Sequence, residues 1–215
     1  MKKNAMNVRV LTQSAMLTAI LLVMYFTPLG MLPTPGQPVT LLTVPVAVGA
    51  MLIGPAEGAL LGCMFGLLSF WRAFQTGTLF ALGVSVPAVF VLCVVTRTLM
   101  GFCCGWVYRL AEKVDRTHTV SCFIGGLAAP VLNTVFYMSV YVYILLHNTL
   151  LQQSIAGAFG EGILVTLRTN VILFIAAYVG VQAVVEAAVG CVVSGLVCKA
   201  VKTAVRRIGR RSAAA

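Results

Sequence analysis

The hydrophobic positions of this 215-residue chain gather into six long runs, at about residues 8–27, 40–53, 56–74, 86–110, 120–146 and 163–201. Charged residues, prolines and glycines separate the runs. A helix of about 20 apolar residues crosses the hydrocarbon core of a bilayer. The pattern therefore predicts an all-α fold, a bundle of six transmembrane helices.

Two of the six runs differ in length from a single crossing. Residues 40–53 include Pro45 and are short for a hydrocarbon core of roughly 30 Å, so this helix is expected to be irregular or packed inside the bundle. Residues 163–201 are longer than one crossing. A tilt, or a break near Gly180, would absorb the excess length.

The composition indicates which solvent surrounds the fold. Hydrophobic residues make up 60% of the chain, charged residues only 9%, and the mean hydropathy is +1.01. A soluble domain of this length does not need so much apolar surface, so residues 1–215 are predicted to form one integral membrane domain in the lipid bilayer. The net charge of +10 does not indicate nucleic acid binding, because the basic residues lie at the ends of the apolar runs.

The basic residues also predict an orientation. They cluster before the first run, between the fourth and fifth, and after the sixth, where the chain ends in a basic tail, residues 202–215. An even number of crossings places these three clusters on one side, which the positive-inside rule identifies as the cytoplasm. Both termini are therefore expected to be cytoplasmic.

Three cations do not follow this rule: Arg72, Arg97 and Arg168. A cation in or beside hydrocarbon costs several kcal/mol, so it usually has a partner or a function. Arg72 follows Trp71, and the pair is either an interfacial anchor or an outer-face site that attracts a ligand carboxylate. The same two interpretations apply to Arg168, which Glu161 could also neutralise.

Arg97 and Glu186 are predicted to lie at matching depths. Arg97 precedes Arg109 by 12 residues, hence roughly 18 Å of regular helix, and Glu186 precedes Lys199 by 13 residues, hence roughly 20 Å. A structural ion pair between two helices would satisfy both side chains, because the guanidinium fork can grip a carboxylate. Alternatively, Arg97 binds the carboxylate of a ligand while Glu186 holds Arg97 from behind.

The fifth run carries polar side chains in its interior. Asn133 lies in the middle of the run, and Tyr137 lies one helical turn further on the same face. Each can pack or hydrogen-bond within the bundle, or line a site for a small amphipathic ligand. Gln75 and Thr76, after the third run, could donate further hydrogen bonds to a ligand or simply be solvated.

Small residues recur at intervals of four on three of the runs, as Ala15 and Ala19, as Gly58, Gly62 and Gly66, and as Gly101 and Gly105. Such faces let two backbones approach closely in a bilayer, where lipid provides no hydrophobic drive for association. Packing inside the bundle is the simplest interpretation of the glycines.

The chain carries no recognisable catalytic chemistry. Its seven cysteines lie in apolar runs without metal-site spacing, and no Ser/His/Asp or Cys/His combination is apparent among two histidines and five carboxylates. A phosphate-binding G-x-x-x-x-G-K-[ST] loop is missing too, so ATP-driven activity would need another polypeptide. The sequence therefore predicts that the chain is not an enzyme and that it binds no metal or cofactor of its own.

Four passages, taken in their order and spacing, resemble the substrate-binding S components of energy-coupling factor (ECF) vitamin transporters. They are Ala15-Met16-Leu17-Thr18-Ala19, the stretch from Val44 to Gly58 around Gly54-Pro55, Thr96-Arg97-Thr98-Leu99-Met100-Gly101, and Asn133-Thr134-Val135-Phe136. The likeness spans most of the chain and is greatest to the pantothenate-type members. Thr96 stands where family members often have proline. This difference affects the choice of vitamin more than the assignment to the family.

The resemblance implies a receptor in the plasma membrane of a prokaryote that captures a small vitamin, pantothenate first, from the outer face. The candidate substrate-binding residues are then Arg97, Asn133, Tyr137, Arg72, Trp71 and Arg168. Ala15 and Ala19 would dock on a transmembrane coupling subunit, which two ATPase subunits drive. Riboflavin or cobalamin as the vitamin, a stand-alone secondary carrier, and a membrane enzyme or assembly factor are the alternatives.

Overall fold

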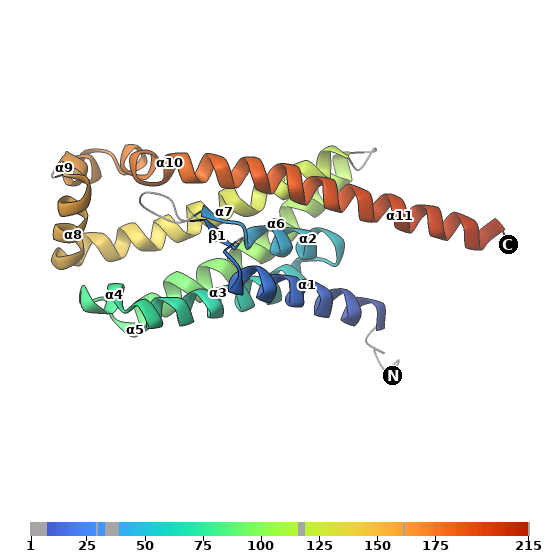
Figure 1. Ribbon diagram of the computed structural model, residues 1–215. Coiled ribbons are helices and arrows are strands. Elements are labelled where there is room, and N and C mark those ends of the chain that lie inside the picture. Colours follow the sequence, from blue (N-terminus) through green and yellow to red (C-terminus); the bar gives the residue numbers. More distant parts are fainter. Residues whose placement is uncertain (1–7, 29, 33–38, 116–118, 161, 215) are drawn as a thin grey trace, which may run out of the picture.

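The computed structural model describes residues 8–28, 30–32, 39–115, 119–160 and 162–214. Its elements are α1 Val8–Phe26, β1 Met31–Leu32, β2 Val39–Thr40, α2 Thr43–Leu52, α3 Pro55–Thr76, α4 Thr78–Ala81, α5 Val86–Phe90, η1 Val91–Val95, α6 Thr96–Val114, α7 Val120–Leu146, α8 Thr149–Phe159, α9 Gly162–Thr169, α10 Val171–Val189, η2 Gly190–Ser194 and α11 Gly195–Ala214. The long helices run along a common axis as an elongated bundle (Figure 1). Apart from one short antiparallel hairpin, β1–β2, the described chain is helical, which confirms the all-α prediction.

Within the described residues, three helices are long and apolar enough to cross a membrane, and they cover Val86–Val114, Val120–Leu146 and Val171–Ala204. Val10–Phe26 and Thr43–Leu52 are shorter apolar helices. The start of α1 and the end of α11 lie at the same end of the bundle (Figure 1). That arrangement agrees with an even number of crossings, while the count of six and the cytoplasmic side stay predictions.

The last apolar run breaks at a different residue from the one predicted. Gly180 lies inside α10, which continues through it without interruption. The chain breaks earlier, at Asn170, whose side-chain oxygen accepts hydrogen bonds from the backbone N–H of Ile172 at 3.1 Å and of Leu173 at 3.3 Å. This side chain caps the start of α10, and an Asn in that position stabilises a new helix start better than a mid-helix glycine does. The predicted basic tail continues α11 as a helix through Ala214.

The second apolar run begins as a strand rather than a helix. Val39 and Thr40 form β2 and pair with β1, and α2 starts only at Thr43. Eight of the ten residues of α2 are buried, so this short helix is packed inside the bundle, as its length predicted.

Two segments of π-helix interrupt the long helices. The first, η1, ends one residue before Thr96-Arg97, and the second, η2, begins four residues after Glu186. A π-helical turn is wider than an α-turn and releases backbone carbonyls from their usual partners, which is why such turns often occur beside functional sites.

The predicted glycine faces join α3 to α6. A Cβ atom added to Gly58 would lie 2.3 Å from the carbonyl oxygen of Gly101, and one added to Gly62 would lie 2.2 Å from that of Arg97. Side chains cannot approach so closely, so only glycine permits this contact between backbones. The contact holds the backbone of Arg97 directly against α3.

Short helices close the end of the bundle opposite the termini (Figure 1). Asn148 joins two of them, because its Oδ1 accepts from Leu151 N at 3.0 Å at the start of α8 and its Nδ2 donates to Leu82 O at 2.9 Å, just after α4. The segments that join the long helices at this end are therefore partly helical.

Candidate functional site

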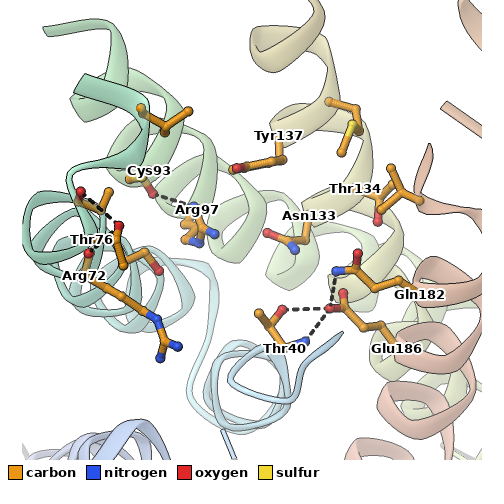
Figure 2. A pocket seen from close by; sticks show the side chains of 15 residues that line it. Thr40, Arg72, Thr76, Cys93, Arg97, Asn133, Thr134, Tyr137, Gln182 and Glu186 are labelled. Atoms are coloured by element: carbon orange, nitrogen blue, oxygen red, sulfur yellow. Dashed lines mark hydrogen bonds between the residues drawn. The ribbon is translucent and has the colours of Figure 1, made fainter. Parts of the chain in front are cut away.

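A polar cavity of about 200 Å³ lies between α3, η1, α6, α7, α10 and β2 (Figure 2). Its polar lining comprises Thr40, Ser69, Arg72, Thr76, Arg97, Asn133, Thr134, Tyr137, Gln182 and Glu186. Four residues that the sequence singled out therefore line one cavity: Arg97, Asn133, Tyr137 and Glu186.

Arg97 supplies a buried cation to this cavity. Its side chain is only 8% exposed, and Nη1 donates to the backbone oxygen of Cys93 at 3.2 Å, a carbonyl within the π-helical turn η1. Its guanidinium carbon lies 4.6 Å from the ring centroid of Phe65 and 5.2 Å from that of Tyr137. The Nε atom has no hydrogen-bond partner among the described residues. Aromatic faces and carbonyls stabilise the cation only in part, because none of them carries a full negative charge.

The predicted ion pair between Arg97 and Glu186 is not formed. Across the described residues, no carboxylate oxygen lies within 4.0 Å of the Arg97 guanidinium. Glu186 is 2% exposed, and its Oε1 instead accepts hydrogen bonds from Thr40 N at 2.6 Å, Thr40 Oγ1 at 2.8 Å and Gln182 Nε2 at 3.1 Å. Figure 2 shows the two charged groups on different sides of the cavity. The β1–β2 hairpin thus supplies two of the three hydrogen bonds that Oε1 accepts, and Arg97 supplies none.

Further polar atoms on the cavity wall lack a partner. Ser69 Oγ and Asn133 Oδ1 are buried and make no hydrogen bond within the described chain, like Arg97 Nε. Buried polar groups in folded proteins are almost always paired, so several unpaired groups around one cavity indicate that something else pairs with them. A small polar solute or water can do so.

Tyr137 forms one wall of the cavity and begins a column of rings. It stacks on Tyr141 at 6.0 Å between centroids, and Tyr141 stacks on Tyr178 at 5.8 Å. The Tyr141 and Tyr178 hydroxyls lie 3.2 Å apart and hydrogen-bond. This column joins α7 to α10 and holds the Tyr137 ring in place beside Arg97.

The remaining candidates lie away from the centre of the cavity. Arg72 lines the cavity but is exposed, and Trp71 is 61% exposed on the outer side of α3. Arg168 lies in α9, but its side chain is outside the described part of the structure, as is Glu161. The structure therefore gives no position for that predicted ion pair.

Sequence reasoning missed Thr40, Ser69 and Gln182. Gln182 could have been found, because it precedes Glu186 by one helical turn on the same face. Thr40 gives no local signal, since its partner Glu186 is 146 residues away.

Ala15 and Ala19 lie on the outside of the bundle. Both are exposed on α1, where Met16 and Ile20 are 61% and 47% exposed beside them. The small residues therefore lie on an apolar, outward face of α1, unlike the glycines of α3 and α6, which contact other backbone inside the bundle.

Fold and cavity together describe a helical membrane protein built around a polar cavity large enough for a small solute. A family model for the substrate-specific component of ECF transporters matches residues 9–203. The chain therefore belongs to this family of transport proteins, whose members associate with the other subunits of an ECF complex.

A curated relative is also similar to this chain. The pantothenate transporter PanT of Leuconostoc mesenteroides subsp. mesenteroides is 34% identical over 114 residues, which make up 51% of this chain and 53% of PanT. The chain thus spans about half the length of this relative. The predicted family is confirmed.

Proposed function

We propose that this chain is the substrate-binding component of an ATP-driven vitamin importer, and that pantothenate is the vitamin. The observation that carries the proposal is Arg97, a cation 8% exposed that lines a cavity and has no carboxylate within 4.0 Å in the described chain. An isolated buried charge is costly, and a ligand carboxylate would neutralise it through charge-assisted hydrogen bonds.

The chemistry of pantothenate suits the other polar groups of the cavity. Its carboxylate can pair with Arg97 and with the Ser69 hydroxyl, and its amide N–H can donate to Asn133 Oδ1. Its two hydroxyls can donate to the Glu186 carboxylate on the far side of the cavity. Riboflavin and cobalamin offer Arg97 no carboxylate and are larger, so a cavity of about 200 Å³ favours pantothenate. The partial similarity to PanT supports the same choice.

The energy for transport would come from other polypeptides. The exposed face of Ala15 and Ala19 would bind a transmembrane coupling subunit, because small residues let a second helix approach α1 closely. Two ATPase subunits would drive that coupling subunit. The complex would lie in the plasma membrane of a prokaryote, with both termini of this chain in the cytoplasm and the cavity reached from outside.

Isothermal titration calorimetry with two ligands tests the proposal. Pantothenol matches pantothenate except that a hydroxymethyl group replaces the carboxylate. We expect the purified chain to bind pantothenate, and to bind pantothenol at least about 100-fold more weakly, because pantothenol leaves the cation unpaired. Equal affinity for the two ligands, or binding of riboflavin in their place, would contradict the proposal. Pantothenate transport by the chain alone in liposomes would show a secondary carrier instead.

A further inference from the structure

A second hollow lies on the outside of the bundle beside the cavity, between the end of α1 and the last turns of α3. We call it the vestibule, and its lining is Tyr25, Phe26, Trp71, Arg72, Gln75 and Thr76. Arg72 and Thr76 also line the cavity, so the vestibule and the cavity are adjacent and share these two residues.

Arg72 is the charged residue in the vestibule lining. Its side chain is exposed and makes no hydrogen bond or ion pair within the part of the chain that the structure describes. Figure 2 shows this side chain extending away from Arg97. The hydroxyl of Thr76 donates to the backbone oxygens of Arg72 at 3.1 Å and Ala73 at 3.2 Å, so it is already engaged. Arg72 therefore places an exposed cation at the boundary between the two hollows.

The rest of the vestibule is largely aromatic and partly fixed. Tyr25 donates its hydroxyl hydrogen to Leu68 O at 3.0 Å, which holds its ring between α1 and α3. Phe26 and Trp71 add apolar surface. A solvated cation framed by aromatic rings suits a small organic anion, whose carboxylate meets the guanidinium while its apolar part meets the rings.

We propose that the vestibule is a first, weak binding site, where Arg72 captures the carboxylate of the anionic solute before it passes to Arg97. The inference rests on the proposed function. Buried Arg97 attracts a solute poorly from a distance, whereas exposed Arg72 acts over about one Debye length, roughly 10 Å at 0.1 M salt. Arg72 would thus determine how fast the solute enters, and Arg97 how long it stays.

Stopped-flow fluorescence in nanodiscs of zwitterionic lipid tests this division, with pantothenate as the probe. The chain has two tryptophans, so a Trp106→Phe background leaves Trp71 in the vestibule as the reporter. Arg72→Gln should lower kon about tenfold at low salt and remove most of its salt dependence, with koff unchanged. Arg72→Lys should keep most of the wild-type kon. Lys199→Gln, which removes an equal charge from α11, is the matched control and should change neither rate.

Other results of these measurements would contradict the vestibule or the proposed function. Normal pantothenate binding with an unchanged kon in Arg72→Gln would overturn the vestibule alone. A raised koff would place Arg72 in the final site and also overturn it. If Arg72→Gln instead lowers only the melting temperature, and only in nanodiscs that contain anionic lipid, then Arg72 is a lipid anchor. Failure of the wild-type chain to bind pantothenate would overturn the proposed function and this inference with it.

Discussion

Arg97 and Glu186 face one cavity from α6 and α10 without forming an ion pair with each other. Thr40 and Gln182 donate hydrogen bonds to the Glu186 carboxylate, whereas Nε of Arg97 has no partner in the described chain. The cavity therefore has a cation on one wall and a carboxylate held by hydrogen bonds on another. A ligand with an acid at one end and hydroxyls at the other can use both walls.

Arg97→Ala is expected to reduce pantothenate affinity by at least about 100-fold, because hydrogen bonds to charged groups contribute about 1.5–3 kcal/mol each. Arg97→Lys should bind with intermediate affinity, since an ammonium keeps the charge but lacks the planar fork. Isothermal titration calorimetry gives both affinities, and thermal melting confirms that each variant is folded. Wild-type affinity in a folded Arg97→Ala protein would contradict the assignment of Arg97 to the ligand.

Thr40→Val is expected to raise the dissociation rate of the ligand at least about tenfold. The substitution removes the hydroxyl that donates to Glu186 at 2.8 Å and keeps the backbone N–H that donates at 2.6 Å. A hydrogen bond to a charged group contributes about 1.5–3 kcal/mol, so loss of this one should let the hairpin leave the cavity more often. Thr203→Val on α11, where the hydroxyl is exposed and bonded to Lys199 O, is the control. Equal dissociation rates in the two variants would show that the hairpin does not retain the ligand.

Ala15→Trp or Ala19→Trp is expected to abolish uptake and leave ligand binding unchanged. Both alanines are exposed, so a large side chain disturbs an approaching subunit rather than the bundle. Uptake of labelled pantothenate by cells that produce the full complex measures the first effect, and calorimetry on the isolated chain measures the second. Ala188→Trp, at an exposed position of α10, should permit normal uptake. Normal uptake by the α1 variants would refute the docking face.

Gly62→Ala is expected to lower both thermal stability and ligand affinity. The new Cβ would lie 2.2 Å from the Arg97 carbonyl oxygen, so α6 must move away from α3 and carry Arg97 with it. Overpacking of this kind costs about 1–3 kcal/mol. Gly180→Ala is the matched change, because apart from neighbouring backbone of its own helix no described atom lies within 4 Å of its added Cβ, and it should leave stability equal or raise it by up to about 1 kcal/mol. Identical melting curves for the two variants would exclude the close contact as a determinant of stability.

Much of the helical architecture could be predicted because helix formation in a bilayer is a local property. The fifth apolar run coincides with α7, Val120–Leu146, and the first and third match α1 and α3 to within two residues. Local cues failed in two places. In the last apolar run the helix breaks at the capping side chain of Asn170 rather than at a glycine. In the second run Thr40 pairs with β1 as part of a strand instead of beginning a helix. The short helices α4 and α8 were missed for a related reason, because packing at the end of the bundle supports them.

The sequence by itself determined the membrane environment, the family and the individual polar residues that hydrocarbon would not tolerate. Apolar run length, charge placement and unusual cations are each visible without knowing the fold. Only the tertiary structure decided how those residues are combined. The hairpin brings Thr40 to Glu186 across 146 residues, and the carboxylate bonds to Thr40 rather than to Arg97. Hydrogen bonds between distant segments depend on three-dimensional packing, so neither spacing nor matching depth could distinguish a closed ion pair from an open cavity.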